Sequence, residues 1–341
     1  MPSKPRLFLH IGTHKTGTTS IQRFCAANRE ALADAGLLYP SFGLGGYPGH
    51  YAHHRLAHAT AGKDDIMDVS HVKHFLGVVR DKMDPAQSVL ISAEPYYRHR
   101  VRNDEGVNSI SDYVTLVGET YEDFDVTVVV MLRRQDLMLE ALYAEHVMAT
   151  AYTDTIATFR KTHGHLLDYR GRLHDWADVF GRENIWVRAF EPSLTGQRIE
   201  REFLEWLGIE WRDTFDLGRR RNVTPGRAFV EFKRMMNVPT QRRRANTSLR
   251  SWVEKLASTK PDAAPDLGAY YLNPEQRLEV LSAYNEDNKV VAQTYLGTDT
   301  LFRLPVETDI EKYAGDLQLS ERDALAMARD LVQLIARSHR S

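Results

Sequence analysis

Five short runs of apolar and β-branched residues recur in the first 190 residues, and stretches with helical spacing separate them. The run at Val126–Leu132 is almost continuously apolar, as expected of a strand that is buried on both faces of a parallel sheet. Strands that alternate with helices predict a three-layer α/β/α protein, in which helices cover both faces of a central parallel sheet. The expected strands are Arg6–Gly12, Leu37–Tyr39, Ser88–Ser92, Val126–Leu132 and Ile185–Phe190.

Two stretches between these runs have a clear helical pattern. Residues Thr18–Ala35 carry apolar side chains on one stripe, and Gly36 suits the C-terminal cap of such a helix. The spacing of apolar residues over Arg134–Thr150 predicts a second helix, directly after the most apolar strand.

The alternation ends near residue 215, and only helices are expected beyond it. A helix is predicted over Arg227–Met236, Asn273 opens a long helix that ends near Gly297, and a capping box at Ser320 opens the last one. We expect an α/β domain over residues 1–305, with a core at 1–215 and a helical, lid-forming part at 216–305, followed by a C-terminal helical extension at 306–341. The last helix is expected to turn inward Leu325, Ala328, Leu331, Val332 and Ile335.

Composition limits the classes of partner. The chain has 44 Lys and Arg against 46 Asp and Glu, a net charge of −2, whereas a nucleic-acid binder is usually strongly basic. The single cysteine, Cys25, excludes an internal disulfide and a cysteine-based zinc site and fits a reducing compartment. No apolar run approaches the ~20 residues of a membrane span, and the N-terminal apolar stretch is too short for a signal peptide. We therefore expect a cytoplasmic protein without a transmembrane segment or a nucleic-acid partner.

The most informative stretch joins the first strand to the first helix, from Gly12 to Ser20. A tight turn at this junction presents successive backbone N–H groups, and the helix dipole adds to them, so the junction suits a phosphate. Lys15 supplies a positive charge, and Gly12 and Gly17 allow a close approach of the backbone. The alternative is an ordinary strand–turn–helix junction with a threonine-rich start.

The junction is not a Walker A loop, because Lys15 precedes Gly17 instead of following the second glycine. The strand Val126–Leu132 ends in Arg133 and Arg134, where a magnesium-binding acid would be expected in a nucleotide hydrolase. A metal-assisted mechanism is therefore disfavoured.

Lys15-Thr16-Gly17-Thr18-Thr19 resembles the loop with which the sulfotransferase family binds the 5′-phosphosulfate of 3′-phosphoadenosine-5′-phosphosulfate (PAPS). The family's second element is a strand followed by Arg, with Ser eight residues later, and both hold the 3′-phosphate. Arg133 matches this arginine, whereas Ala141 stands where the family has Ser. A weaker resemblance, at Ile185–Glu191, is to the bacterial, carbohydrate-directed branch. Taken together, the resemblance to the family covers roughly residues 6–300, but only the two cofactor motifs are specific.

The resemblance implies a P-loop-like sheet, PAPS as co-substrate and no metal. Arg134 would compensate for the missing Ser, and the basic segment Arg219–Arg221 would fold over the 3′-phosphate, as a basic segment does in the family. The other basic segment, Arg242–Arg244, would meet an anionic acceptor; the alternative for both segments is solvated surface charge. The residues expected to hold the cofactor are Thr13, His14, Lys15, Thr16, Gly17, Thr18, Thr19, Ser20, Arg133, Arg134 and Arg220.

Two candidates compete for the role of the base that deprotonates the acceptor. Glu94 follows the strand Ser88–Ser92, and open α/β sheets place their sites at the carboxyl ends of strands. Resemblance supports it, since several carbohydrate sulfotransferases use a Glu just after a comparable strand; the alternative is a Glu that caps the next segment or pairs with Arg98.

The second candidate is a histidine of the cluster His50, His53, His54 and His58. Three of these, His50, His54 and His58, recur every four residues, a spacing that could also align metal ligands on a helix. A surface or packed cluster is the commonest explanation, and a base at His53 or His54 is an intermediate one.

We interpret the chain as a PAPS-dependent sulfotransferase that acts on a hydroxyl of a carbohydrate or glycolipid, with Lys15 at the leaving phosphate and Glu94 or His54 as base. A membrane-bound acceptor would be contacted only transiently. The alternatives are a P-loop nucleotide kinase and a non-catalytic anion-binding protein that retains the fold.

Overall fold

In the computed structural model, contacts divide the chain into two compact units, each assembled from three stretches of sequence. The sheet unit comprises Met1–Arg134, Asp168–Arg219 and Glu286–Leu304, and the helical unit comprises Gln135–Leu167, Arg220–Asn285 and Pro305–Ser341. The boundaries at Arg219 and Leu304 lie close to residues 215 and 305, which the sequence suggests. The units differ from the expected parts in that Gln135–Leu167 belongs to the helical unit and Glu286–Leu304 to the sheet unit. The structure describes residues 4–102, 106–191, 194, 196–218, 225–238, 243–306 and 319–338, with residues 243 and 244 described by their backbone alone.

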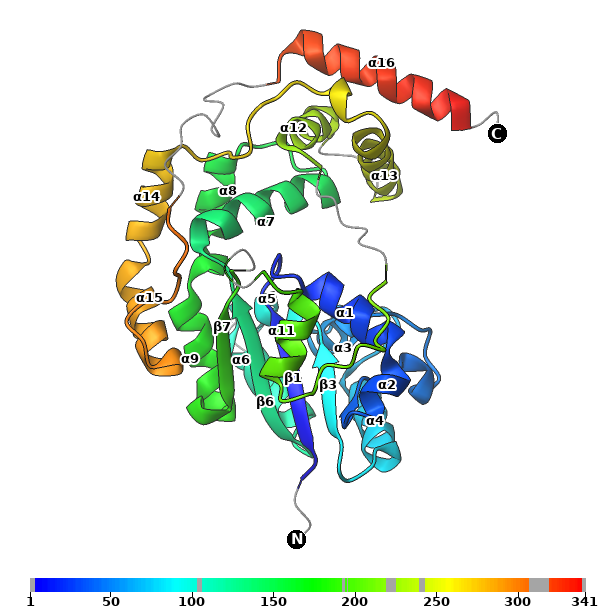
Figure 1. The fold of residues 1–341 in the computed structure, drawn as a ribbon, viewed down its shortest axis with the longest axis vertical. Coiled ribbons are helices and arrows are strands. Elements are labelled where there is room, and N and C mark those ends of the chain that lie inside the picture. The colour runs from blue at the N-terminus through cyan, green and yellow to red at the C-terminus, as the bar shows by residue number, and fades with distance from the viewer. Residues whose placement is uncertain are drawn as a thin grey trace. The chain divides into compact units, whose positions relative to one another are not determined.

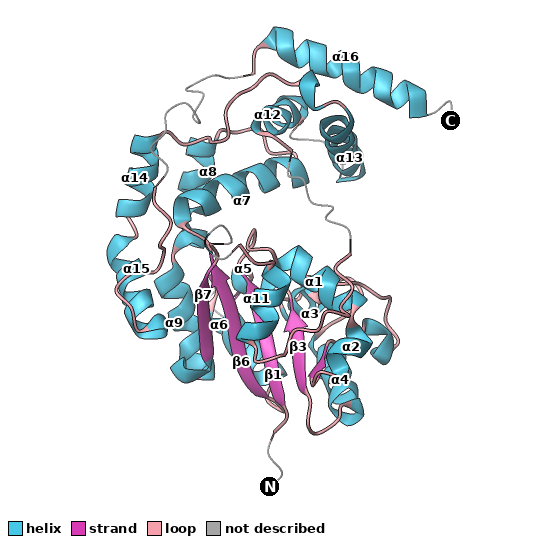
Figure 2. Ribbon diagram, viewed as in Figure 1, coloured by secondary structure: helices cyan, strands magenta, loops and turns pink. Residues whose placement is uncertain are grey.

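The sheet unit is built on one parallel sheet with the strand order β2-β3-β1-β6-β7 (Figures 1 and 2). All five expected strands are present in it, and the predicted central parallel sheet is confirmed. Strand β1 lies in the middle, where Leu7 pairs with Val89 of β3 on one side and with Val126 of β6 on the other. The five strands are β1 (Arg6–Gly12), β2 (Leu37–Leu38), β3 (Ser88–Ser92), β6 (Asp125–Leu132) and β7 (Ile185–Ala189).

Helices cover both faces of this sheet, as the three-layer prediction requires (Figure 1). Side chains alternate along β1, so Leu7 and Leu9 enter the core beneath one helical layer, and Phe8 enters the core beneath the other. The first layer contains α3 (His54–Thr60), α4 (Val69–Lys82), α6 (Ser111–Thr120) and α9 (Tyr169–Phe180), and the second contains α1 (Thr18–Ala27), α2 (Arg29–Ala33) and α11 (Ile199–Trp206).

The order of the strands switches sides at β1. The strands that follow it in sequence, β2 and β3, lie on one side of β1, and the later strands β6 and β7 lie on the other. In open α/β sheets such a switch point leaves a crevice at the carboxyl ends of the adjacent strands, and ligands bind there. The short helix α5 (Pro95–Arg98) follows β3 at this edge; a two-stranded pair, β4 (Val101–Arg102) and β5 (Asn108–Ser109), comes next in the chain.

The helical unit has its own apolar core, which includes Val147, Phe232, Val253 and Met327. Buried Lys233 donates to the carbonyl of Thr150 at 3.1 Å and so satisfies the C-terminal end of α7. The α-helices among the described residues of this unit are α7 (Gln135–Ala149), α8 (Ile156–His163), α12 (Arg227–Met236), α13 (Arg243–Thr259), α14 (Pro274–Ser282) and α16 (Glu321–Ser338).

Several helix predictions need correction. The helix expected over residues 18–35 breaks at Asn28, whose side-chain amide donates to the carbonyls of Phe24 at 2.9 Å and Asp216 at 2.8 Å. The long helix expected after Asn273 is interrupted after Ser282; α15 (Asn285–Val291) then continues into a π-helical turn, Ala292–Leu296.

The last helix is confirmed, but part of its expected inward face is wrong. Leu325 and Val332 are 69% and 65% exposed, whereas Met327 and Leu331 are buried. Leu325 stands two residues before Met327, which rotates it by roughly 200° around the helix, away from the core. No helix in the described part of the chain has the length and apolarity of a membrane span.

Candidate anion-binding and acid–base site

The loop between β1 and α1 has a backbone that only certain residues tolerate. Gly12 has φ 102°, and a Cβ atom there would lie 3.3 Å from Cβ of Glu94. Gly17 has φ 79°, and a Cβ atom there would lie 3.1 Å from a side-chain carbon of Ile199. Lys15, with φ 62°, also adopts the left-handed conformation. The two glycines are therefore required by the shape of the loop and by its packing.

The start of α1 leaves backbone donors unsatisfied. Its N-cap residue is Gly17, which has no side chain to accept a hydrogen bond. Within the described residues, the N–H groups of Gly17, Thr18 and Thr19 have no protein acceptor. Three such donors at the positive end of a helix dipole form a site that attracts an anion.

The hydroxyl groups of the loop divide into two sets. Thr13 donates to the Met131 carbonyl at 3.1 Å, Thr16 donates to the Thr13 carbonyl at 2.7 Å, and Thr18 donates to Glu94. These three predicted cofactor-binding side chains thus hold the loop onto the sheet in this structure. The hydroxyls of Thr19 and Ser20, which are partly exposed, remain as additional donors beside the backbone N–H groups.

The cations predicted around the loop occupy different positions. The Lys15 ammonium makes no hydrogen bond or ion pair with any described residue, and His14 is half-buried in the same loop. Arg133 donates to the Lys15 carbonyl at 3.0 Å, so the end of β6 is tied to the loop. Arg134 is buried and donates to the Leu304 carbonyl at 2.8 Å, a contact that anchors the stretch 286–304; its binding of a cofactor stays a prediction. Arg220 and most of the two arginine triplets lie outside the described residues.

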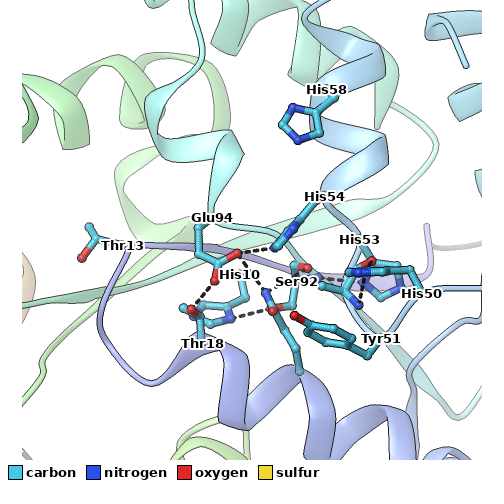
Figure 3. Close-up of polar contacts among 12 residues, drawn as sticks. His10, Thr13, Thr18, His50, Tyr51, His53, His54, His58, Ser92 and Glu94 are labelled. Atoms are coloured by element: carbon cyan, nitrogen blue, oxygen red, sulfur yellow. Dashed lines mark hydrogen bonds and ion pairs between the residues drawn. The ribbon is translucent and has the colours of Figure 1, made fainter. Parts of the chain in front are cut away.

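Glu94 lies at the carboxyl end of β3, beside the loop, as the sequence predicts (Figure 3). Its Oε1 accepts the Thr18 hydroxyl, and its Oε2 accepts Nε2 of His54 at 2.5 Å and Nε2 of Gln22 at 3.1 Å. It stands at the N-cap position of α5 but caps nothing there, and its ion pair is with His54, not with Arg98. The structure thus brings together the two residues that the sequence offered as alternative bases.

The pKa of Glu94 is set by opposing effects. Burial, the largest single effect, raises the pKa of this carboxyl, but the hydrogen bond from His54, the positive charge of His54 when protonated, the charge of His14 and the hydrogen bond from Thr18 together outweigh it. The net result holds the pKa of Glu94 well below its usual range. Glu94 is therefore an ionised carboxylate, which suits an anchor for an imidazole better than a strong proton acceptor.

His54 is the most accessible member of this group. It is the first residue of α3, its side chain is 33% exposed, and its Nε2 is bound to Glu94. Among the described residues, none makes a hydrogen bond to its second nitrogen, Nδ1. A neutral imidazole whose Nε2–H faces a carboxylate presents Nδ1 as a proton acceptor.

The other histidines of the cluster serve the structure. His53 is buried; its Nδ1 accepts the Ser92 N–H at 3.1 Å and its Nε2 donates to the Pro40 carbonyl at 2.8 Å. Burial lowers the pKa of His53 to about 4, which keeps it neutral. Nδ1 of His58 is hydrogen-bonded to Nε2 of His99 at 2.8 Å, and the ring of His50 stacks on that of Tyr51. In the portion of the chain that is described, no three His, Cys, Asp or Glu side chains form a group that could hold a metal ion.

Sequence reasoning missed three buried polar residues below this pair. Gln22 donates to Glu94, and Ser92 Oγ lies 2.9 Å from Nδ1 of His10 and 3.3 Å from Nε2 of Gln22. Burial lowers the pKa of His10 to about 4. The available signal was weak: a Gln beside the apolar stripe of a helix, and a His and a Ser inside buried strands.

One further cavity of about 680 Å³ lies along β7, in the same unit. Its lining includes Arg188, which donates to the Glu202 carbonyl at 3.0 Å, together with Trp206 and Tyr295. The lining contains no residue of the loop and neither Glu94 nor His54, so the anion site and this cavity are distinct features.

The fold is that of a three-layer α/β protein, in which a strand–loop–helix junction with unsatisfied N–H donors lies next to a His–Glu pair. No protein-family model matches the chain, and no curated protein matches its sequence. Among solved structures, it is similar to a sulfotransferase from Alicyclobacillus acidocaldarius, with 15% identity and a TM-score of 0.41. The match covers 64% of this chain and 87% of the other. A likeness of this degree carries no argument about function, which has to rest on the site.

Proposed function

We propose that this protein transfers the sulfuryl group of PAPS to a hydroxyl group of a carbohydrate or glycolipid acceptor. The observation that carries the proposal is the hydrogen bond from Thr18 to Glu94, because it joins the anion-binding loop directly to the His54–Glu94 pair. Group transfer from an anionic donor needs these two parts next to each other: a cradle for the donor's phosphate and a group that takes the acceptor's proton.

The loop residues fit the 5′-phosphosulfate end of PAPS. Among the described residues the N–H groups of Gly17, Thr18 and Thr19 lack protein acceptors, and the N-cap residue, Gly17, has no side chain that could accept from them. The motif at residues 15–19 resembles the family's loop for this group, and Arg133 resembles the family's arginine for the 3′-phosphate. The bound co-substrate would supply the sulfuryl group and a phosphate as its leaving group.

Lys15 has the role of stabilising the leaving phosphate. Its ammonium has no described protein partner, so its charge is available to an anion in the loop. Charge that is fixed where negative charge develops lowers the barrier of a group transfer most effectively. Arg133 donates to the Lys15 carbonyl and thereby holds the backbone from which this side chain extends.

His54 and Glu94 divide the work of the base between them. The acceptor hydroxyl loses its proton to Nδ1 of His54 as its oxygen forms the new bond to sulfur. The bond from sulfur to the phosphate oxygen breaks with its electron pair, which stays on the phosphate. Glu94, ionised and buried, holds the imidazole through Nε2 and stabilises the imidazolium that results. The acceptor class is carried over from the weaker resemblance at Ile185–Glu191, and a cytoplasmic site of action remains part of the proposal.

The test is transfer of radiolabelled sulfate from PAPS to a panel of sugar and glycolipid acceptors, with protein alone and acceptor alone as blanks. The proposal expects label in at least one carbohydrate acceptor, and expects the label to disappear in His54→Gln. Transfer of phosphate from ATP to the same panel, without sulfate transfer, would replace the proposal with a kinase function.

A further inference from the structure

Both oxygens of the Glu94 carboxylate are bound by the same helix. Thr18 donates to Oε1 and Gln22 donates to Oε2, and these two residues stand four apart on α1. Positions i and i+4 of a helix lie one above the other, so one face of α1 meets the carboxylate at both ends. The three side chains are 4%, 0% and 5% exposed for Thr18, Gln22 and Glu94, so water does not compete for these bonds.

The contacts of Gln22 also fix the orientation of its amide. Its nitrogen faces the ionised Oε2 of Glu94 at 3.1 Å and the Ser92 carbonyl at 3.5 Å, and both of these atoms are acceptors. The NH₂ group must therefore point at Glu94, and the amide oxygen must point away from it. This geometry favours the charged carboxylate, because a protonated Glu94 would lose one of its acceptors.

We propose that Gln22 is a positioning residue for the base: with Thr18 it locks Glu94 so that His54 is held by Nε2 and presents Nδ1 to the acceptor. The proposal rests on the function proposed above, in which His54 accepts the proton. Oε2 of Glu94 receives both the amide of Gln22 and the imidazole of His54, so rotation of the carboxylate would disturb both bonds together. Gln22 reaches the imidazole only through Glu94, as the outer partner of a histidine commonly does in metal and acid–base sites.

The position of α1 gives this arrangement a further consequence. The helix begins at Thr18. The backbone N–H of Thr18 is one of the unsatisfied donors of the anion-binding loop, and its hydroxyl donates to Glu94. Gln22 then follows one turn later on the same rigid element. One helix, α1, thus carries a backbone donor of the anion-binding loop together with both side chains that hold Glu94.

The first experiment uses the free protein and needs no activity. Nitrogen NMR of imidazole-labelled protein, at a pH where His54 is neutral, distinguishes a protonated from an unprotonated Nδ1. We expect the wild-type protein to show one tautomer at His54, with the proton on Nε2, and Gln22→Met to show a mixture of both. Met has nearly the volume of Gln but no donor. An unchanged single tautomer in Gln22→Met, or a wild-type proton on Nδ1, would overturn the proposal.

The second experiment is a double-mutant cycle on sulfuryl transfer. We expect Gln22→Met to lower kcat about 10- to 100-fold with little change in KM for PAPS, as loss of an outer-shell partner typically does. In a Glu94→Gln background the same change should have almost no further effect, because Gln22 acts only through that carboxylate. An equal loss in both backgrounds would mean that Gln22 merely supports the core.

Cys25→Ala is the matched control, since Cys25 lies on the same helix, is fully buried and makes no contact with Glu94. It should leave the tautomer and kcat unchanged, which separates loss of the amide from a general disturbance of α1. If no sulfuryl transfer is found for any variant, the tautomer measurement still tests whether Gln22 positions His54 through Glu94.

Discussion

The imidazole of His54 and the carboxylate of Glu94 meet at 2.5 Å, between Nε2 and Oε2, at the carboxyl edge of the sheet. His54 opens α3, and Glu94 follows β3, so two different elements bring the pair together. The partly exposed imidazole and the buried carboxylate then have different tasks, although each alone had been a candidate for the base. Four expected outcomes follow from this pair, from the loop beside it and from the buried histidines of the sheet unit.

Removal of either member of the pair should slow transfer by about 10² to 10⁴, the usual effect of losing a general base. Glu94→Gln keeps the shape but loses the charge that orients His54, and His54→Gln loses the proton acceptor itself. Because they act as a unit, the double variant should be about as slow as the slower single one. Steady-state kcat values for the three variants provide the measurement.

His74→Gln is the control for this series, because His74 is exposed on α4 and has no part in the site. It should transfer sulfate at the wild-type rate. If the rate losses of Glu94→Gln and His54→Gln multiplied in the double variant, the two residues would act independently. The proposal that His54 and Glu94 act as one unit would then be wrong.

Lys15→Ala should lower kcat by about 10² to 10³, equivalent to roughly 3–4 kcal/mol of barrier, by analogy with removal of one donor to a developing anion. The free energy of unfolding should hardly change, because the ammonium has no described protein partner. Urea unfolding and turnover are measured on the same samples, with Lys161→Ala, an exposed change on α8, as the comparison. Near-wild-type turnover in Lys15→Ala would remove Lys15 from the mechanism.

Binding of 3′,5′-bisphosphoadenosine should raise the melting temperature more than 5′-AMP or ATP does. A ligand at a hundredfold excess over its Kd stabilises the folded state by about 2.7 kcal/mol, which a melting curve resolves. Arg133→Lys should reduce the shift for the bisphosphate and leave the shift for 5′-AMP, because only Arg offers a planar fork to a phosphate. Equal shifts for the bisphosphate and 5′-AMP would show that the 3′-phosphate is not recognised.

The protein should lose stability as the pH falls from about 6.5 towards 4. Burial lowers the pKa of His10 and His53 to about 4 and that of His99 to about 3, so the unfolded chain takes up these protons before the folded one does. Stability is therefore intact above the ordinary pKa of histidine, and each fully buried histidine contributes a loss of about 3 kcal/mol on acidification. Urea unfolding at pH 7 and pH 5 measures the loss. His53→Gln should reduce the difference between the two; an equal difference would mean that His53 does not titrate in this range.

The sheet was predictable from the sequence because its strands are short, apolar and rich in β-branched residues. Each of the five runs, such as Arg6–Gly12 and Ser88–Ser92, forms a strand of the one parallel sheet. Helix boundaries were less predictable where a distant partner sets them. The helix that starts at Thr18 stops at Asn28 because the Asn28 side chain bonds to the backbone of Asp216, 188 residues later.

The positions of the loop and of Glu94 were also predictable, because each comes directly after a predicted strand. The pairing of Glu94 with His54 was not, because 40 residues separate them. Only the folded chain brings the start of α3 to the end of β3, where the His53 N–H donates to the Ser92 carbonyl at 3.0 Å. Gln22 could not be found from the pattern, which places it beside the apolar stripe and gives no sign that its side chain is fully buried. A buried amide is costly unless it is bonded, and the bond that explains it is visible only once α1 and Glu94 are placed.

The measurement that tests the central claim most directly is single-turnover transfer from radiolabelled PAPS by wild-type protein and by His54→Gln, with the released 3′,5′-bisphosphoadenosine quantified in parallel. The account predicts that wild-type protein passes label to a carbohydrate hydroxyl and releases one bisphosphate for each sulfate transferred. It predicts a rate at least 10²-fold lower in His54→Gln, with PAPS still bound. Binding of PAPS without transfer to any acceptor by the wild-type protein, or equal rates in the two proteins, would contradict it.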